Sequence, residues 1–490
     1  MQTPPGWRQT LTSCWVFPAI IAWKIVLMGA WALPPPANDA FFYDGAVVNW
    51  LGQGDYVNPS LARALPISGT VVFSAYPPGY EAVLAVWMAI FGPSGQSAQG
   101  LHVGLFAVFA GLALAVLRHL GVAARAANLG GLFLLGITFH DRPDSVAQVL
   151  GLFAFYCWIR AWRLPAAVLL AATALTSLHI GAMYAAAVWG FAVSARRENG
   201  TWPVALPFVV ATVFALAVGG VFLRWPQAWA GFREHLAVTP ALAGLRWPEW
   251  DVLAKVGRTV PGLLLLGTWA VVAGARRPSG LSPALRALAL PALGVVAGAL
   301  FVLAPNYVQA AAYPQVLVVA LAWPALVEAG APARLRPIAH AVAMGGVALV
   351  SIRAVGLSTW GVACAIDVGA PAAIRRVQEV VRAQPDRSTA LVSSAYLYSL
   401  AGDSRVACGL ADWPGAWTEG EARPTCLVLT AYDYYRRYQR ELDALVARGV
   451  VTITGVEQQG TVPPPDAFPR WQRVVQHVAW APVIVHLEWR

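Results

Sequence analysis

The run from Ala98 to Leu117, AQGLHVGLFAVFAGLALAVL, contains no Asp, Glu, Lys or Arg and is followed at once by Arg118 and His119. A helix of this length spans about 30 Å, which matches the hydrocarbon core of a bilayer. Basic residues at one end of such a run are typical of its cytoplasmic side. The run therefore predicts a membrane-spanning helix whose C-terminal end faces the cytoplasm.

Similar apolar runs recur along the first 358 residues and set the class of the protein. Of the 490 residues, 58% are hydrophobic and only 12% are charged, about half the charged fraction of a soluble domain. We therefore predict a polytopic α-helical membrane protein. The net charge of +10 comes from arginines in short loops, a pattern that anchors loops in the cytoplasm. The sequence contains no basic tract with interleaved aromatic residues, so it gives no indication of a nucleic-acid partner.

Hydropathy and the Lys/Arg bias of the short loops predict about eleven transmembrane helices in residues 1–358, with the N-terminus in the cytoplasm. The loop 34–97 then lies outside and carries interfacial helices; its apolar run 80–91 is too short to cross a bilayer and is either interfacial or re-entrant. The predicted spans are 14–33 (a retained first helix rather than a signal peptide), 98–117, 126–139, 145–159, 164–178, 181–194, 204–223, 259–275, 287–304, 313–328 and 338–357.

Residues 359–490 differ in composition and predict a small soluble α/β domain, which lies outside, in the periplasm, by the parity of the spans. Helical patterns cover 371–382 and 432–448, and short apolar runs at 390–393, 426–430 and 450–454 predict strands of a partly parallel sheet. Cys408 and Cys426 are either a disulfide or two free thiols. The five cysteines show no spacing typical of a metal site.

Two carboxylates stand just beyond the first predicted span, in the stretch Asn38–Ala46, NDAFFYDGA. Asp39 and Asp44 lie there among aromatic residues, and apolar surroundings raise the pKa of a carboxyl towards that of a useful base. The alternative is that Asp39 caps a short amphipathic helix. The same loop carries Gly54-Asp55-Tyr56 and Tyr76-Pro77-Pro78-Gly79-Tyr80.

The predicted topology collects ionisable residues from separate loops at one depth on the outer side. Such groups are costly at a membrane and usually line a cavity or a substrate path. Two of these residues have a structural alternative. Asp144 could be the N-cap of the helix that begins near Pro143, and the ring of His179 could be hydrogen-bonded to the backbone of its own turn. The basic residues of 224–258 are either solvated or a cationic clamp on a phosphate. The set includes Asp39, Asp44, Asp55, His140, Asp141, Arg142, Asp144, His179, Lys255 and Arg258.

The order of these motifs over about residues 15–200 resembles the GT-C glycosyltransferases, and in particular the bacterial protein O-mannosyltransferase and aminoarabinose-transferase branch. The matching positions are Asp39, Tyr43 and Ala46, then Gly54-Asp55-Tyr56, Tyr76–Tyr80 and Arg142-Pro143-Asp144. The resemblance implies an enzyme of the cell inner membrane and cell envelope. It would transfer a sugar from a polyprenyl-phosphate donor to a lipid, glycan or protein acceptor at the outer face.

The resemblance also implies roles for residues. Asp39 matches the general base of the first outer loop, and Asp144 matches a second acidic residue that shapes the site. Ala40 stands where the best-known members carry an acidic residue, and His179 stands where a lysine is common. No metal ligands are predicted, and a divalent cation is left open as a cofactor. The expected substrate-binding residues are Tyr43, Asp44, Tyr76, His140, Arg142, His179, Lys255 and Arg258.

The main rival interpretation is a transporter or flippase of lipid-linked sugars. A transporter is expected to place charges at mid-membrane on broken helices, often in repeated halves. Here the charges gather on one side and no repeat is evident, which favours the enzyme. A membrane-anchored scaffold is a third interpretation, and the polar convergence of the outer loops argues against it.

Overall fold

The computed structural model describes residues 40–54, 56, 77–119, 143–178, 369–386, 388–400, 403, 405–408, 423–459 and 481–490, with isolated residues in 18–26, 180–217, 247–250 and 333–341. Most predicted spans, and with them the count of eleven, lie wholly or partly outside the described residues. So does the boundary between residues 358 and 359.

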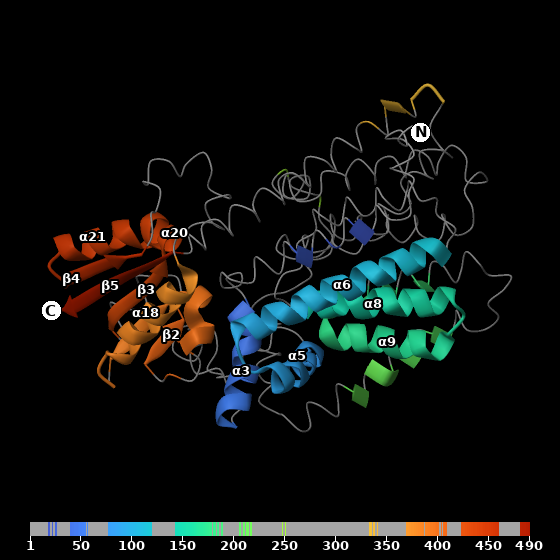
Figure 1. Ribbon diagram of the computed structural model, residues 1–490, viewed down its shortest axis with the longest axis horizontal. Helices are drawn as coiled ribbons and strands as arrows, with labels where there is room; N and C mark the ends of the chain where they lie inside the picture. The colour runs from blue at the N-terminus through green and yellow to red at the C-terminus, as the bar shows by residue number, and fades with distance from the viewer. Residues whose placement is uncertain are drawn as a thin grey trace, which may run out of the picture.

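Three helices lie side by side on the side of the described structure away from the C-terminal strands, namely α6 (Gly95–His119), α8 (Pro143–Ile159) and α9 (Arg163–Thr176) (Figure 1). They occupy the stretches predicted as the spans 98–117, 145–159 and 164–178. Among the described residues, one helix, Gly95–Val116, is long and apolar enough to cross a membrane. α6, α8 and α9 therefore correspond to the three predicted spans that the described residues cover in full.

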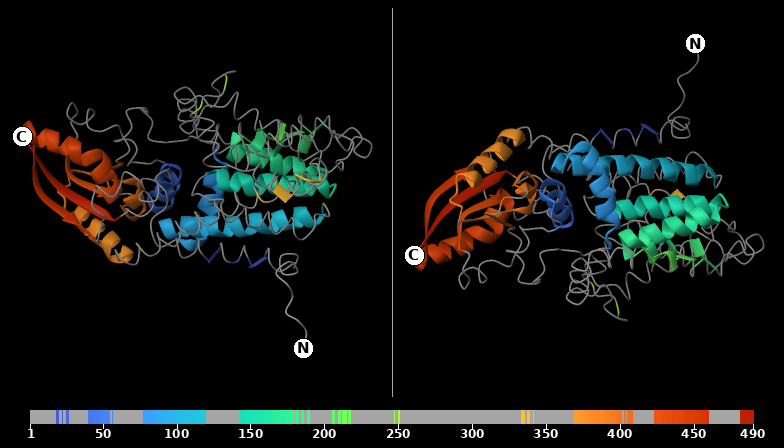
Figure 2. Two further views of the ribbon diagram at one scale, coloured as in Figure 1. Left: turned by 90° about the horizontal axis from the view of Figure 1, so that it is seen from above. Right: turned by 90° about the horizontal axis from the view of Figure 1, so that it is seen from below.

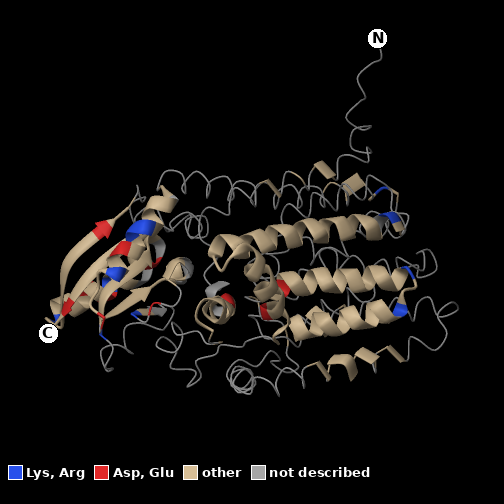
Figure 3. Cartoon of the chain, turned by 60° about the horizontal axis from the view of Figure 1, so that its bottom comes forward, with Lys and Arg blue, Asp and Glu red and all other residues tan. Residues whose placement is uncertain are grey.

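Arginines gather where α6 and α8 end and α9 begins. His119 Nε2 lies 3.2 Å from the Ile159 carbonyl oxygen, so the C-terminal ends of α6 and α8 are neighbours. Arg163 donates from Nη1 to the Trp158 carbonyl at 2.7 Å, and its guanidinium lies 4.2 Å from the centre of the Trp158 ring. We call this the basic end; it contains Arg118, Arg160 and Arg163 (Figure 3). Its arginines follow the pattern expected of a cytoplasmic side.

Two helices of the stretch 34–97, which the sequence predicts as the first outer loop, lie at the opposite end. α5 (Gly79–Phe91) has 13 residues, in agreement with the prediction of a helix too short to cross a bilayer. Its buried face carries Leu84 and Met88, whereas Val86 and Ile90 are 65% and 70% exposed. An apolar face left uncovered in this way suits a helix that lies along a membrane surface.

The other helix, α3 (Ala40–Gln53), differs from the prediction. We expected an amphipathic helix, but every residue from Tyr43 to Asn49 is buried. The reason is that α3 lies between two parts of the protein, with α5 on one side and η2 (Ser394–Leu400) of the C-terminal region on the other (Figure 2). Partners from distant parts of the chain therefore cover both faces.

The C-terminal region contains a five-stranded sheet in the order β2-β1-β3-β5-β4. β1 is parallel to β2 and β3, whereas β5 is antiparallel to β3 and β4, so the sheet is partly parallel as predicted. Strands β1, β3 and β4 fall at the three predicted runs, and β2 and β5 were not predicted. The strands are β1 (Thr389–Val392), β2 (Val406–Cys408), β3 (Pro424–Thr430), β4 (Val451–Gln458) and β5 (Pro482–Trp489).

Helices lie beside this sheet at both positions that the sequence predicts. The first is α18 (Ala370–Arg382), and the second runs from α20 (Ala431–Asp433) through the π-helical turn η3 (Tyr434–Tyr438) into α21 (Gln439–Ala447). Leu442 and Leu445 of α21 are buried in one cluster with strand residues such as Leu427. This apolar cluster is the core that joins helix and sheet.

The sheet register decides between the two states left open for Cys408 and Cys426. Cys408 is paired with Val392 and Cys426 with Ala390, so the cysteines lie on the two strands that flank β1. Two strand spacings amount to about 9–10 Å, whereas a disulfide requires Cα atoms within about 7 Å. Cys426 is accordingly a buried free thiol.

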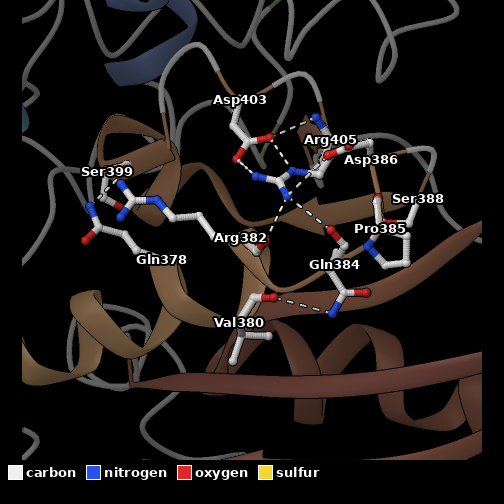
Figure 4. A network of polar contacts seen from close by, with 10 residues as sticks. All are labelled: Gln378, Val380, Arg382, Gln384, Pro385, Asp386, Ser388, Ser399, Asp403 and Arg405. Atoms are coloured by element: carbon white, nitrogen blue, oxygen red, sulfur yellow. Dashed lines mark hydrogen bonds and ion pairs between the residues drawn. The ribbon is translucent and has the colours of Figure 1, made fainter.

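A guanidinium network fastens the start of β2 to the end of α18 (Figure 4). Arg405 donates from Nε and Nη2 to the Asp403 carboxylate at 2.9 and 2.7 Å. Its Nη1 donates to the carbonyl oxygens of Arg382 and Gln384 at 2.9 and 3.1 Å. Because one side chain satisfies three separate acceptors, it holds the short edge strand β2 in place.

Candidate functional site

Three buried carboxyl groups lie at the end of the helices opposite the basic end (Figure 3). They are Asp44 of α3, which is 0% exposed, Glu81 of α5, which is 5% exposed, and Asp144 of α8, which is 8% exposed. We call the region around these three residues the acidic end. Buried charges are costly unless they are paired or hydrogen-bonded, so the partners of each carboxyl decide what it can do.

Asp44 is held by a tyrosine from the next helix. Tyr80 donates from Oη to Oδ1 of Asp44 at 2.8 Å, and the same hydroxyl lies 3.3 Å from Nε2 of His102 on α6. Tyr80 and His102 are 0% and 1% exposed. Tyr80 is the last residue of the Tyr76–Tyr80 motif, so this motif supplies the side chain that joins α3, α5 and α6.

Glu81, the next residue, lies in a more apolar position. Its Oε2 is buried and has no hydrogen-bond partner in the part of the chain that the structure describes. Burial, with a smaller contribution from the neighbouring Asp44 carboxylate, raises the pKa of Glu81 to about 8. Glu81 therefore holds its proton more tightly than an ordinary glutamic acid does.

Asp144 is anchored by a contact between helix ends. α8 begins at Pro143, so Asp144 belongs to its first turn and is not the N-cap that one alternative expected. Proline suits the first helical position because its missing N–H has no partner there in any case. Ser177, which directly follows α9, donates from Oγ to Oδ1 of Asp144 at 3.1 Å. The start of α8 and the end of α9 thus meet.

A glycine brings α5 against the end of α9. A Cβ atom at Gly79 would lie 2.7 Å from Oγ1 of Thr176 and 2.9 Å from the Leu175 carbonyl oxygen. Only glycine allows so close an approach to a backbone. Within the Tyr76–Tyr80 motif, the glycine therefore contacts α9 and the last tyrosine contacts Asp44 of α3. These two contacts connect the region around Asp144 with the region around Asp44.

The described structure contains three of the predicted site residues, namely Tyr43, Asp44 and Asp144. Tyr43 packs with Tyr80 and Leu84 in the apolar cluster of the acidic end. Asp39 directly precedes the first residue of α3 in the chain. The predicted residues that lie outside the described ones are Asp39, Tyr76, His140, Arg142, His179, Lys255 and Arg258.

Sequence reasoning gave no role to Glu81, His102 or Ser177. A signal was present for the first two, because an ionisable residue inside an apolar run is costly and marks a functional position. Ser177 carried no such signal. Among the described residues, no group of three or more His, Cys, Asp or Glu side chains could hold a metal ion.

The amino-acid sequence matches no protein-family model and no curated protein. Solved structures, in contrast, share the fold. The crystal structure of ArnT from Cupriavidus metallidurans bound to undecaprenyl phosphate superposes with a TM-score of 0.54 at 15% identity, over 95% of this chain and 97% of that chain. The apo state of the same protein gives a TM-score of 0.53 at 13% identity over the same shares.

A weaker similarity, with a TM-score of 0.48 and 12% identity, is to the oligosaccharyltransferase of Archaeoglobus fulgidus in complex with zinc and sulfate. It covers 85% of this chain and 68% of that one. ArnT is an aminoarabinose transferase of the GT-C class. The similarity to ArnT confirms the predicted GT-C membrane fold.

Proposed function

We propose that this protein is a GT-C glycosyltransferase that moves a sugar from a polyprenyl-phosphate donor to an acceptor at the outer face of the cell inner membrane. The observation that carries the proposal is the fold shared with ArnT over 95% of the chain. That ArnT was crystallised with undecaprenyl phosphate supports a polyprenyl phosphate as the lipid part of the donor. The acidic end would face the periplasm with the C-terminal domain, and the basic end and the N-terminus would face the cytoplasm.

The chemistry proposed is a displacement at the anomeric carbon of the sugar. Asp39 takes the proton of the acceptor hydroxyl, whose oxygen then forms a bond to that carbon. The bond between the same carbon and the phosphate oxygen breaks, and polyprenyl phosphate leaves with the electron pair. Cationic side chains stabilise the charge that develops on the phosphate; Arg142, Lys255 and Arg258 are the residues proposed for this role.

The remaining predicted residues would shape the site. Asp144, held by Ser177, would present a carboxylate beside the sugar, and Tyr43, Tyr76, His140 and His179 would contact the substrates. Asp44 is fully buried, so its contribution would come through the position of α3. No described observation favours a transporter, because Asp144 of α8 and Arg163 of α9 each belong to the first turn of their helix rather than to its middle.

The proposal is tested with the purified full chain in proteoliposomes that contain radiolabelled polyprenyl-phosphate hexoses or pentoses and an envelope extract as acceptor. Label should pass covalently to the extract, and Asp39→Asn should lower the rate by about 100-fold or more. Asp443→Asn, at an exposed carboxyl of α21, is the matched control and should transfer at the wild-type rate. Label that crosses the bilayer without covalent transfer would identify a flippase and reject the enzyme.

A further inference from the structure

One hydroxyl joins three helices at the acidic end. Tyr80 Oη lies 2.8 Å from Oδ1 of Asp44 on α3 and 3.3 Å from Nε2 of His102 on α6, while its own backbone is in the first turn of α5. All three side chains are buried, with at most 1% of any of them exposed. The contact therefore lies inside the packed region and not on its surface.

Apolar packing alone fixes the rotation of α3 poorly. α3 is buried from Tyr43 to Asn49, and the hydrophobic part of its contacts has no direction of its own. A buried hydrogen bond does have a direction, and it adds little net stability, about 0.5–1.5 kcal/mol. Its main consequence here is that one face of α3, the face of Asp44, must point to Tyr80.

We propose that Tyr80 is a positioning residue for the transfer reaction, acting through Asp44 to fix α3 and with it the residue that directly precedes α3, Asp39. This inference rests on the proposed function, in which Asp39 is the base. Asp39 is joined by a peptide bond to Ala40, the first residue of α3. A rotation or shift of α3 therefore moves the backbone of Asp39 as well.

The direct test is Tyr80→Phe, which keeps the ring in its apolar cluster with Val47 and Leu84 and removes only the hydroxyl. We expect kcat to fall about 10- to 100-fold, as misplacement of a catalytic group by about 1 Å does, with KM for the donor unchanged. Backbone amides of α3 should exchange hydrogen faster in this variant, and those of α8 should not.

Tyr184→Phe is the matched control. Tyr184 is 3% exposed, and its hydroxyl has no hydrogen-bond partner within the described part of the chain. This variant should keep the wild-type kcat and the wild-type exchange of α3. If it loses as much activity as Tyr80→Phe, loss of any buried tyrosine hydroxyl explains the effect and the positioning role is wrong.

A second pair of variants separates position from charge. Asp44→Asn keeps an acceptor oxygen for the Tyr80 hydroxyl, whereas Asp44→Leu does not, so kcat should fall further in the leucine variant. Equal losses in the two would overturn the inference. A wild-type protein without transferase activity would reject the proposed function alone, because faster α3 exchange in Tyr80→Phe still tests the contact. An active wild type with unchanged kcat in Tyr80→Phe would reject the positioning role alone.

Discussion

The Ser177 hydroxyl donates to Oδ1 of Asp144 at 3.1 Å and so closes the α8–α9 hairpin at the end opposite its turn. The two residues are 33 positions apart in the chain, and both are buried, with 0% and 8% of their surface exposed. A carboxylate in the first turn of a helix also gains from the helix dipole. The hydrogen bond from Ser177 and the position in the first turn of α8 therefore both favour this placement of Asp144.

Ser177→Ala should weaken this end of the hairpin. Removal of a buried donor leaves the carboxylate under-satisfied, which costs about 1–3 kcal/mol, and transfer should slow because Asp144 loses its orientation. The measurements are the melting temperature in detergent and the transfer rate. Thr176→Val is the control, because Thr176 is equally buried but donates only to the Ala172 carbonyl of its own helix. A melting temperature of Ser177→Ala no lower than that of the control would contradict the prediction.

Features that depend on the length of an apolar run could be predicted from the sequence. The run 98–117 is found within α6 and the run 80–91 within the short α5, and the runs 390–393, 426–430 and 450–454 overlap strands β1, β3 and β4. In each case a local pattern decides the element, because hydropathy and residue spacing act within one segment. The GT-C fold was predicted in a different way, from the order of motifs over about residues 15–200, which resembles that of the GT-C glycosyltransferases.

Features that depend on distant partners could not be predicted. The burial of α3 results from η2, about 350 residues further on, so the sequence around Asp44 gives no sign that both faces are covered. The hydrogen bond from Tyr80 to Asp44 joins residues 36 positions apart, and the sequence of the Tyr76–Tyr80 motif does not predict which residue accepts it. The edge strand β2 has three residues, which are too few for the hydrophobic pattern of a strand to be recognised in the sequence.

Gly79→Ala should separate α5 from α9. The added methyl group would meet the Leu175 carbonyl, which belongs to the backbone and cannot rotate away. Overpacking of this kind costs about 1–3 kcal/mol, and the displaced α5 would carry Tyr80 away from Asp44. Melting temperature and transfer rate should both fall. Gly111→Ala, in α6 with open space at its Cβ position, should keep activity and gain slightly from helix propensity. Equal behaviour of the two variants would contradict this account of the contact.

Arg405→Ala should loosen the edge of the C-terminal sheet. The change leaves Asp403 without its guanidinium and two backbone carbonyls without their donor. Amides of β2 should exchange hydrogen several-fold faster in the full-length protein. Arg376→Ala is the comparison, because Arg376 pairs with Glu457 on an exposed surface and surface pairs contribute little. If Arg376→Ala has the larger effect on β2, the network in Figure 4 does not hold the strand.

The same network predicts a loss of stability in acid. The hydrogen bonds from Arg405 hold the pKa of Asp403 below its usual value. A carboxyl with a lowered folded-state pKa contributes stability above its unfolded pKa, and that contribution disappears as pH falls through the folded value. Protection of β2 amides should therefore decrease below about pH 4 in the wild type. Arg405→Ala should abolish this acid dependence; an unchanged dependence would show that another group is responsible.

Cys426 should be inert in the folded protein. Burial raises the pKa of its thiol to about 12, with a smaller contribution from Glu457, and the thiolate is the reactive form. Peptide mapping after maleimide treatment at neutral pH should find Cys426 unmodified, and treatment after denaturation should find it fully modified. A disulfide-linked peptide that contains both Cys408 and Cys426 would contradict the sheet register.

Glu81 should make the protein less stable as pH rises. A carboxyl whose folded-state pKa is raised gives its full stabilising contribution below the unfolded value of about 4.5, and this contribution is lost as pH rises through the folded value of about 8. The melting temperature should therefore fall between about pH 4.5 and 8 and then level off. Glu81→Gln, which keeps the shape without the ionisation, should flatten this part of the curve and be the more stable protein at pH 8. Glu488→Gln, at an exposed carboxyl of β5, should retain the wild-type slope. A wild-type curve that stays flat across this range would mean that Glu81 ionises as an ordinary glutamic acid does, and would contradict this prediction.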